Sequence, residues 1–243
     1  MKVLIVGNPQ YKNAFHHYDP DMTFEYAYMD ELVADDVLDD IDLVCFTGGE
    51  DVDPAVYGEE KHPSTFSDPK RDEYEANFFQ RVLSKKLPMV GICRGSQFLT
   101  VMNGGKLVQD VSNHAIGGTH QMQGLLPPSH SGGGKVRWEF PVTSTHHQMM
   151  YPFNLPLKDY QVVGWANSLS DQYEGAPGLE ADLCCFSEEG EVKEGAIEPE
   201  VVYYPNTRCL AVQYHPEYMS IQSTGVQWFQ QAIRCYLFDT INY

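Results

Sequence analysis

The sequence predicts an α/β fold in which a mostly parallel central sheet is covered by helices on both faces and carries extra antiparallel strands. Two observations support this class. Short apolar runs typical of buried strands recur along the chain, and they alternate with helix-like segments near both ends. With 243 residues the chain can bury a substantial core. We therefore expect residues 1–243 to form a single domain.

The first half of the chain alternates predicted strands and helices. We expect strands at residues 2–7, 23–29, 41–46 and 89–92, because each is a short apolar run. Helices are predicted at residues 30–39 and 68–86, and the second has an apolar face formed by Tyr74, Phe78, Val82 and Leu83. A third helix is expected from Ser96 to Asn103, ending at Gly104-Gly105.

The second half is predicted to be richer in strands. Residues 106–111 form a short extended piece, and residues 112–134, rich in Gly, His and Pro, are expected to form a long loop or hairpin. Further strands are expected at residues 136–140, 142–147, 161–166, 182–187, 201–204 and 210–214. A final helix is predicted at residues 218–238.

Composition restricts the kinds of partner. The chain has 34 acidic and 16 basic residues, a formal net charge of −18, which would repel nucleic acid and anionic membranes. No apolar run approaches the length of a membrane span, and the N-terminus lacks a signal-peptide pattern. Its six cysteines mostly lie in apolar runs, so we expect reduced thiols and a cytoplasmic protein.

A predicted strand turns directly into a helix at Cys93. Glycines stand two residues to either side, at Gly91 and Gly95, which is typical of a nucleophile elbow. The start of the helix would favour a negatively charged sulfur and so lower the thiol pKa. The alternative is an ordinary buried cysteine, which the flanking glycines make less attractive.

A base for this thiol must come from another segment. His215 follows the predicted strand at 210–214 and Glu217 is two residues further on, so both side chains could lie on one side of a sheet edge. The alternative is a polar turn that opens a helix. Gly48-Gly49 also follows a strand and could supply backbone N–H groups to an oxyanion, or could be a plain tight turn.

No metal or cofactor is predicted. His114, His120 and His130 lie in one segment, but their spacing matches no standard ligand set and no cysteine joins them. Loop or substrate contacts are the favoured interpretation of these histidines. His147 could equally be a structural histidine or a contact of the substrate.

Several motifs together resemble the class I glutamine amidotransferase family, in particular its γ-glutamyl hydrolase branch, the γ-glutamyl-γ-aminobutyrate and folate γ-glutamyl hydrolases. The elbow motif is Gly91-Ile-Cys-Arg-Gly-Ser-Gln97, followed by Gly104-Gly105 and Gln109-Asp110. The others are Gly48-Gly-Glu-Asp-Val-Asp-Pro54 with Tyr57-Gly58, Ser144-Thr-His-His-Gln148, Glu194-Gly-Ala-Ile-Glu198 and Val212-Gln-Tyr-His-Pro-Glu217. They occur in the family's order and cover nearly the whole chain.

The resemblance implies a flavodoxin-like class I glutamine amidotransferase fold and a set of site residues. It implies Cys93 as nucleophile, His215 as general base and acid, and Glu217 as the residue that orients the histidine. Backbone N–H groups of Gly49 and Arg94 would form the oxyanion hole, and Gln97 and His147 would lie near the bound γ-glutamyl group.

The function expected from these residues is hydrolysis of a γ-glutamyl amide bond through a thioester on Cys93, with a small-molecule substrate. One alternative is a glutaminase subunit that supplies ammonia to a separate synthetase. Another is a binding protein with a vestigial site. The sequence leaves open a homodimer or a synthetase partner, and it does not identify the amine half of the substrate.

Overall fold

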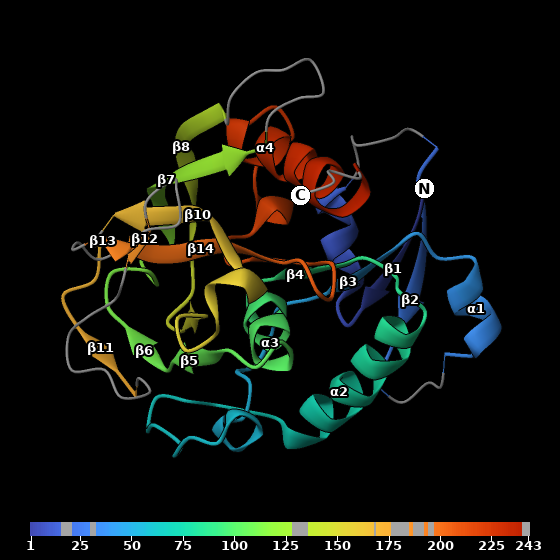
Figure 1. Ribbon diagram of the computed structural model, residues 1–243, viewed down its shortest axis with the longest axis horizontal. Helices are drawn as coiled ribbons and strands as arrows, with labels where there is room; N and C mark the ends of the chain where they lie inside the picture. Colours follow the sequence, from blue (N-terminus) through green and yellow to red (C-terminus); the bar gives the residue numbers. More distant parts are fainter. Residues whose placement is uncertain are drawn as a thin grey trace.

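The computed structural model describes residues 1–15, 21–29, 33–127, 136–167, 169–175, 185–186, 192–193 and 197–239. Among these residues, nine strands form one sheet in the order β2-β1-β3-β4-β15-β14-β10-β7-β8 (Figure 1). The pairings from β2 to β15 are parallel, and those from β15 to β8 are antiparallel. The predicted α/β class is therefore confirmed, with a parallel half and an antiparallel half.

The strands of this sheet are β2 (Thr23–Ala27), β1 (Lys2–Val6), β3 (Leu43–Phe46), β4 (Met89–Ile92), β15 (Cys209–Val212), β14 (Ile197–Tyr204), β10 (Gln161–Asn167), β7 (Gly118–Leu126) and β8 (Val136–Ser144). Three small two-stranded sheets pair β6 (Asp110–Val111) with β11 (Tyr173–Glu174), β5 (Lys106–Val108) with β9 (Met149–Tyr151), and β12 (Cys185–Phe186) with β13 (Val192–Lys193).

Helices cover both faces of the parallel half. On one face lie α2 (Pro69–Ser84) and α3 (Arg94–Met102), and on the other lie α4 (Thr224–Ala232) and the short helix η1 (Pro9–Ala14) (Figure 1). A π-helical segment, η5 (Ile233–Phe238), continues α4, and α1 (Asp35–Asp39) packs at the edge. The remaining short helices are η2 (Pro54–Tyr57), η3 (Leu157–Asp159) and η4 (Pro216–Tyr218).

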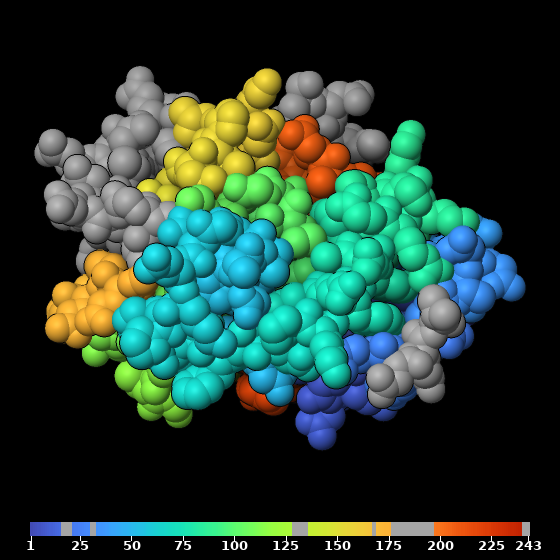
Figure 2. All heavy atoms as spheres, turned by 90° about the horizontal axis from the view of Figure 1, so that it is seen from below, coloured from blue at the N-terminus to red at the C-terminus, as the bar shows by residue number. Residues whose placement is uncertain are grey.

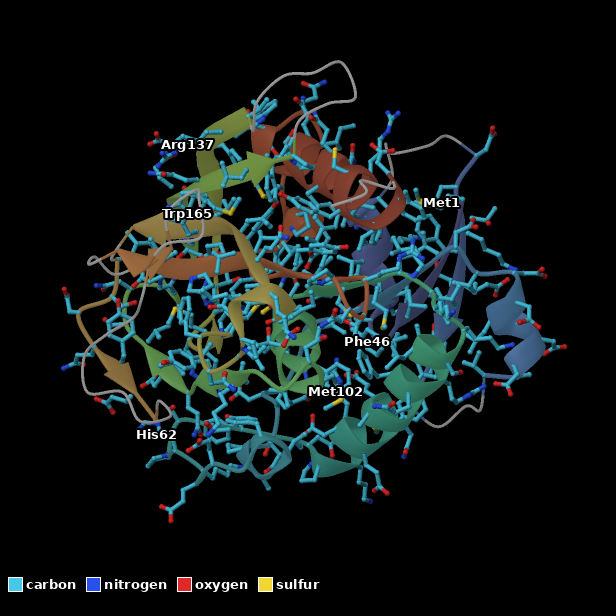
Figure 3. The ribbon with its side chains drawn as sticks, viewed as in Figure 1. Met1, Phe46, His62, Met102, Arg137 and Trp165 are labelled. Carbon is cyan, nitrogen blue, oxygen red and sulfur yellow. The ribbon has the colours of Figure 1, made fainter. Side chains whose placement is uncertain are left out.

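The strand pleat divides the core into two layers. In β1, Val3 and Ile5 belong to the layer under α4, whereas Leu4 and Val6 belong to the layer under α2 and α3. Phe46 lies between the sheet and α2 (Figure 3), with its ring 5.1 Å from that of Phe98. From below, α2 and residues 50–68, in teal and cyan, form much of the surface (Figure 2).

Several predicted boundaries move for identifiable reasons. Helix α3 begins at Arg94 rather than Ser96, because the Cys93 carbonyl already accepts hydrogen bonds from the N–H groups of Ser96 and Gln97. The last helix begins at Thr224 rather than residue 218, because the Ser223 side chain caps it and residues 216–218 form the separate turn η4.

Of the two alternatives predicted for residues 112–134, the hairpin is confirmed in part and the long loop was wrong. Residues 118–126 form the full strand β7, paired along its length with β8. Gly124 is in that strand because a Cβ there would lie 2.6 Å from the Trp228 ring of α4, so this glycine serves helix packing rather than a turn.

In the part of the chain that the structure describes, no helix is long and apolar enough to cross a membrane.

Candidate active site

Cys93 lies at the turn between β4 and α3 with φ 54° and ψ −114°, an uncommon conformation for a residue with a side chain. The flanking glycines allow the backbone to pass closely. A Cβ on Gly91 would lie 2.2 Å from the Gly95 carbonyl oxygen, and one on Gly95 would lie 2.1 Å from the Phe46 carbonyl oxygen. The turn thus has the geometry of the predicted elbow.

Strand β15 brings His215 to the same edge. It lies parallel to β4 with Val212 opposite Ile92, and the Val212 carbonyl accepts the Cys93 N–H at 2.8 Å. His215 lies near Cys93, which raises the pKa of the imidazole, and its Nδ1 lies 2.5 Å from Oε1 of Glu217. The nucleophile predicted from one segment is therefore beside a histidine–carboxylate pair from a segment more than a hundred positions away.

The contacts of His215 determine its charge. Burial lowers the pKa of the imidazole, but hydrogen bonds with Cys93 and Glu217 and their charges outweigh it and raise the pKa to about 10. The ring therefore carries a proton on both nitrogens at neutral pH.

Three further residues surround this imidazole and were not singled out from the sequence. The Tyr218 ring stacks on it at 4.7 Å, and the Tyr11 hydroxyl lies 3.5 Å from Nδ1. The Thr143 hydroxyl accepts the backbone N–H of His215 at 2.7 Å, which ties β8 to the site. Their positions depend on tertiary contacts for which no local sequence signal exists.

Gly49 has φ +140°, and a Cβ there would lie 2.1 Å from Nη1 of Arg71. Arg71 donates from Nη2 to the carbonyls of Thr47 at 3.1 Å and Gly48 at 3.0 Å. Because a peptide N–H points away from the preceding carbonyl, the Gly48 contact directs the Gly49 N–H away from Arg71. Gly48 is itself close to Cys93, since a Cβ there would lie 3.5 Å from that of Cys93.

The side chain of Arg94 is buried in an ion-pair network. Its guanidinium pairs with Asp72 and Glu75 of α2 and lies over the ring of Phe98. Glu75 also accepts from Nε of Arg71 at 2.8 Å. One carboxylate therefore supports both arginines, and only the backbone of residue 94 is available for the role that the resemblance implies.

A pocket of about 230 Å³ opens beside Cys93. Its lining includes both predicted substrate contacts, Gln97 and His147, and the acidic residues Glu50 and Asp51. Nε2 of Gln97 donates to the Gln148 carbonyl at 3.2 Å.

His147 contacts two carboxylates at this pocket. Its Nε2 lies 3.2 Å from Asp51, and its Nδ1 lies 3.4 Å from Asp110. The hydrogen bond with Asp51 raises the pKa of His147. Asp51 belongs to the motif at residues 48–54, but no role was predicted for it from the sequence.

Comparison with known proteins shows the family to which this chain belongs. The family model described as Peptidase C26 matches residues 26–168. The chain belongs to the Peptidase C26 family. One relative is Protein NtpR of Enterococcus hirae, which is 30% identical over 183 residues that cover 74% of this chain and 68% of NtpR.

Other relatives of this Peptidase C26 protein match over shorter stretches. The Lactococcus lactis protein named "Putative glutamine amidotransferase-like protein YvdE" is 36% identical over 121 residues, 45% of this chain. The chain spans 51% of YvdE and 27% of a Mycobacterium tuberculosis relative, so it covers about half or less of their length. The chain is therefore similar both to the family described as Peptidase C26 and to proteins named as glutamine amidotransferase-like.

Solved structures agree with the fold. A glutamine amidotransferase from Thermotoga maritima superposes with a TM-score of 0.54 and 18% identity, covering 97% of this chain and 82% of that one. A Thermoplasma acidophilum protein described as part of a GMP synthase gives a TM-score of 0.59 at 16% identity, covering 97% and 94%. The Peptidase C26 chain thus has a class I glutamine amidotransferase-like fold.

Proposed function

We propose that this Peptidase C26 protein hydrolyses a γ-glutamyl amide bond, with Cys93 as the nucleophile. The observation that supports this most directly is the proximity of the Cys93 sulfur, at the start of α3, to the His215–Glu217 pair. A cysteine sulfur, an imidazole held by a carboxylate and nearby backbone donors are the components of cysteine-dependent acyl transfer.

In the proposed reaction the Cys93 sulfur attacks the amide carbonyl carbon. The resulting oxyanion accepts hydrogen bonds from the backbone N–H groups of Gly49 and Arg94. His215 gives a proton to the leaving amine, the C–N bond breaks, and a γ-glutamyl thioester remains on the sulfur. Water then attacks the thioester while His215 takes a proton from it, and glutamate leaves as the Cys93 thiolate and the protonated imidazole are restored.

The pocket has groups that suit the free end of a γ-glutamyl substrate. Its carboxylates, Glu50 and Asp51, could pair with an α-ammonium group, and His147 could pair with an α-carboxylate. Gln97 would add an amide oxygen, because its Oε1 has no hydrogen-bond partner in the described part of the chain. These contacts would select glutamyl over simple acyl groups.

The test is a panel of γ-glutamyl amides, including glutamine, assayed for released glutamate with the purified protein alone. We expect release from at least one compound, loss of release in Cys93→Ala, and retention in Cys235→Ala, a matched control because Cys235 is also a free, partly buried thiol. A Cys93→Ala protein with full activity would overturn the proposal. Labelling of Cys93 by a glutamine-analogue electrophile separates a working site from a vestigial one.

A second candidate is a glutaminase that supplies ammonia to a synthetase. It is supported by neighbours with the same fold whose descriptions name PurLQS and a GMP synthase. Both candidate functions use the same three residues, so the two are distinguished by the amine half of the substrate. Activity on glutamine alone that rises when a synthetase partner is added would favour this second candidate.

A further inference from the structure

Five buried side chains form a cluster behind the pocket wall: His114, His120, His146, Glu198 and Glu200, called here the His/Glu cluster. They come from three segments that are distant in sequence, at residues 114–120, 146 and 198–200. Histidine spacing alone indicated no metal site, and His130 lies outside the described residues. The fold adds His146 and two carboxylates of β14, which the spacing of the other histidines could not show.

Three ligand atoms of the cluster form a nearly regular triangle. Nδ1 of His114 lies 3.1 Å from Nε2 of His146, and these two nitrogens lie 3.5 and 3.4 Å from Oε1 of Glu200. Zinc binds such atoms at about 2.0–2.2 Å in a tetrahedron, so neighbouring ligand atoms are roughly 3.3 Å apart. The triangle therefore matches one face of a tetrahedral site.

Hydrogen bonds to the ring nitrogens that point away from the cluster indicate which nitrogen of each imidazole carries the proton. Nε2 of His114 lies 3.1 Å from Oε2 of Glu198, and this carboxylate already accepts from the N–H groups of Leu169 and Ser170 and from the Tyr173 hydroxyl. Glu198 is thus an acceptor, and His114 carries its proton on Nε2.

The same reasoning applies to the second imidazole. Nδ1 of His146 lies 3.0 Å from the Gln148 carbonyl, which can only accept, so His146 carries its proton on Nδ1. When both imidazoles are neutral, two lone pairs and a carboxylate oxygen converge on one point, and this arrangement favours a positive charge there. Metal-binding histidines are held in this way by carboxylates and carbonyls.

Glu200 and His120 provide the second observation. Glu200 is fully buried, and its Oε2 has no hydrogen-bond partner among the residues that the structure describes. Nε2 of His120 lies 3.0 Å from the other oxygen, Oε1, and its ring is 5.0 Å from that of His114. A buried carboxylate with so few donors is costly unless a cation accompanies it.

We propose that the His/Glu cluster binds one divalent transition-metal ion of the zinc class. His114, His146 and Glu200 are the ligands, and His120 is the candidate fourth. Imidazole nitrogens with one carboxylate suit zinc, and complete burial suits a structural rather than a catalytic ion.

The ion would stabilise the wall of the candidate active site. The Gln148 carbonyl that accepts from His146 also accepts from Gln97, which lines the pocket. Glu198 holds the backbone at residues 169 and 170 as well. The proposal does not depend on the reaction proposed above, since it concerns only these contacts.

The test measures metal directly. The full chain is stripped with a chelator, dialysed against Zn²⁺ or Co²⁺, and analysed for bound metal by mass spectrometry, for the Co²⁺ visible spectrum and for Tm. We expect one tightly held ion per chain, a tetrahedral Co²⁺ spectrum and a higher Tm. Glu200→Gln should lose stoichiometric binding, and Glu198→Gln should weaken it about 10–100-fold, as for other outer partners of metal ligands.

The matched control is His62→Asn. His62, Asp110 and Glu174 form a second, more exposed group that could hold an ion, and His62 lies at the edge of the molecule (Figure 3). Metal content unchanged in His62→Asn but lost in Glu200→Gln supports the proposal. Absence of tightly bound metal in the wild-type chain, or equal binding in Glu200→Gln, overturns it and indicates a shared proton instead. If Glu200→Gln does not fold, the wild-type stoichiometry and Co²⁺ spectrum decide.

Discussion

Replacing Gly49 by alanine should reduce kcat for glutamate release by about 10²–10³-fold. The new Cβ would lie 2.1 Å from Nη1 of Arg71, so the side chain or the peptide must move. Either movement breaks the Arg71 contacts with the Thr47 and Gly48 carbonyls, which orient the Gly49 N–H. Loss of one oxyanion donor costs about 2.7–4 kcal/mol in other hydrolases, which corresponds to this range.

The same substitution should also lower the free energy of unfolding, because φ +140° costs a residue with a side chain about 1–3 kcal/mol. Gly58→Ala is the matched control. Gly58 has φ +74° but nothing lies within 4 Å of the place where a Cβ would stand, so alanine should cost about 1–2 kcal/mol of stability and leave kcat unchanged. Both quantities are measured by urea unfolding and a glutamate-release assay. A Gly49→Ala protein with wild-type kcat and stability would refute this account of the Gly49 peptide.

Three other predictions concern the charged groups. Glu217→Gln should lower the pKa of His215, which an NMR titration measures. It should also reduce kcat on the order of 10⁴-fold, as in other triads that lose this carboxylate. The pKa of His215 is about 10 in the folded protein against an ordinary 6.5, so its protonation stabilises the fold fully below pH 6.5, and this stabilisation is lost as the pH rises through 10. The free energy of unfolding should therefore decline between these pH values, and the decline should be smaller in Cys93→Ala. Arg94→Met should cost about 3–5 kcal/mol, since it removes the arginine partner of buried Asp72 and one of the two arginine partners of buried Glu75. Arg81→Met, at an exposed ion pair, should cost much less in the same urea titration.

The parallel half of the fold was predictable because its signals are local. The strand Met89–Ile92 has its predicted bounds, and the glycines around Cys93 are required by backbone contacts within the same short segment and its neighbouring strand. His215 and Glu217 followed from their position after a buried run. These features depend on periodicity and turn chemistry, which a sequence displays directly.

The remainder depends on contacts between distant segments. Strand β7 was not predicted as a strand because it contains glycines and a histidine. The reason for Gly124 is a contact outside the strand, since its lack of a side chain makes room for Trp228. Arg71 showed no local sign that it holds the carbonyls before Gly49, and Tyr11 reaches His215 across 204 positions. The His/Glu cluster is the clearest case, because its members are separated by up to 86 positions, from His114 to Glu200.

Glu75 has a consequence for how relatives of this chain can diverge. One of its oxygens accepts from Arg71 and the other pairs with Arg94, so both walls of the elbow depend on one side chain of α2. Exchange of Glu75 alone would remove one ion-pair partner from each of the two guanidinium groups at once. We expect evolution to replace residues 71, 75 and 94 in concert, and sequences in which only one of them differs should be rare.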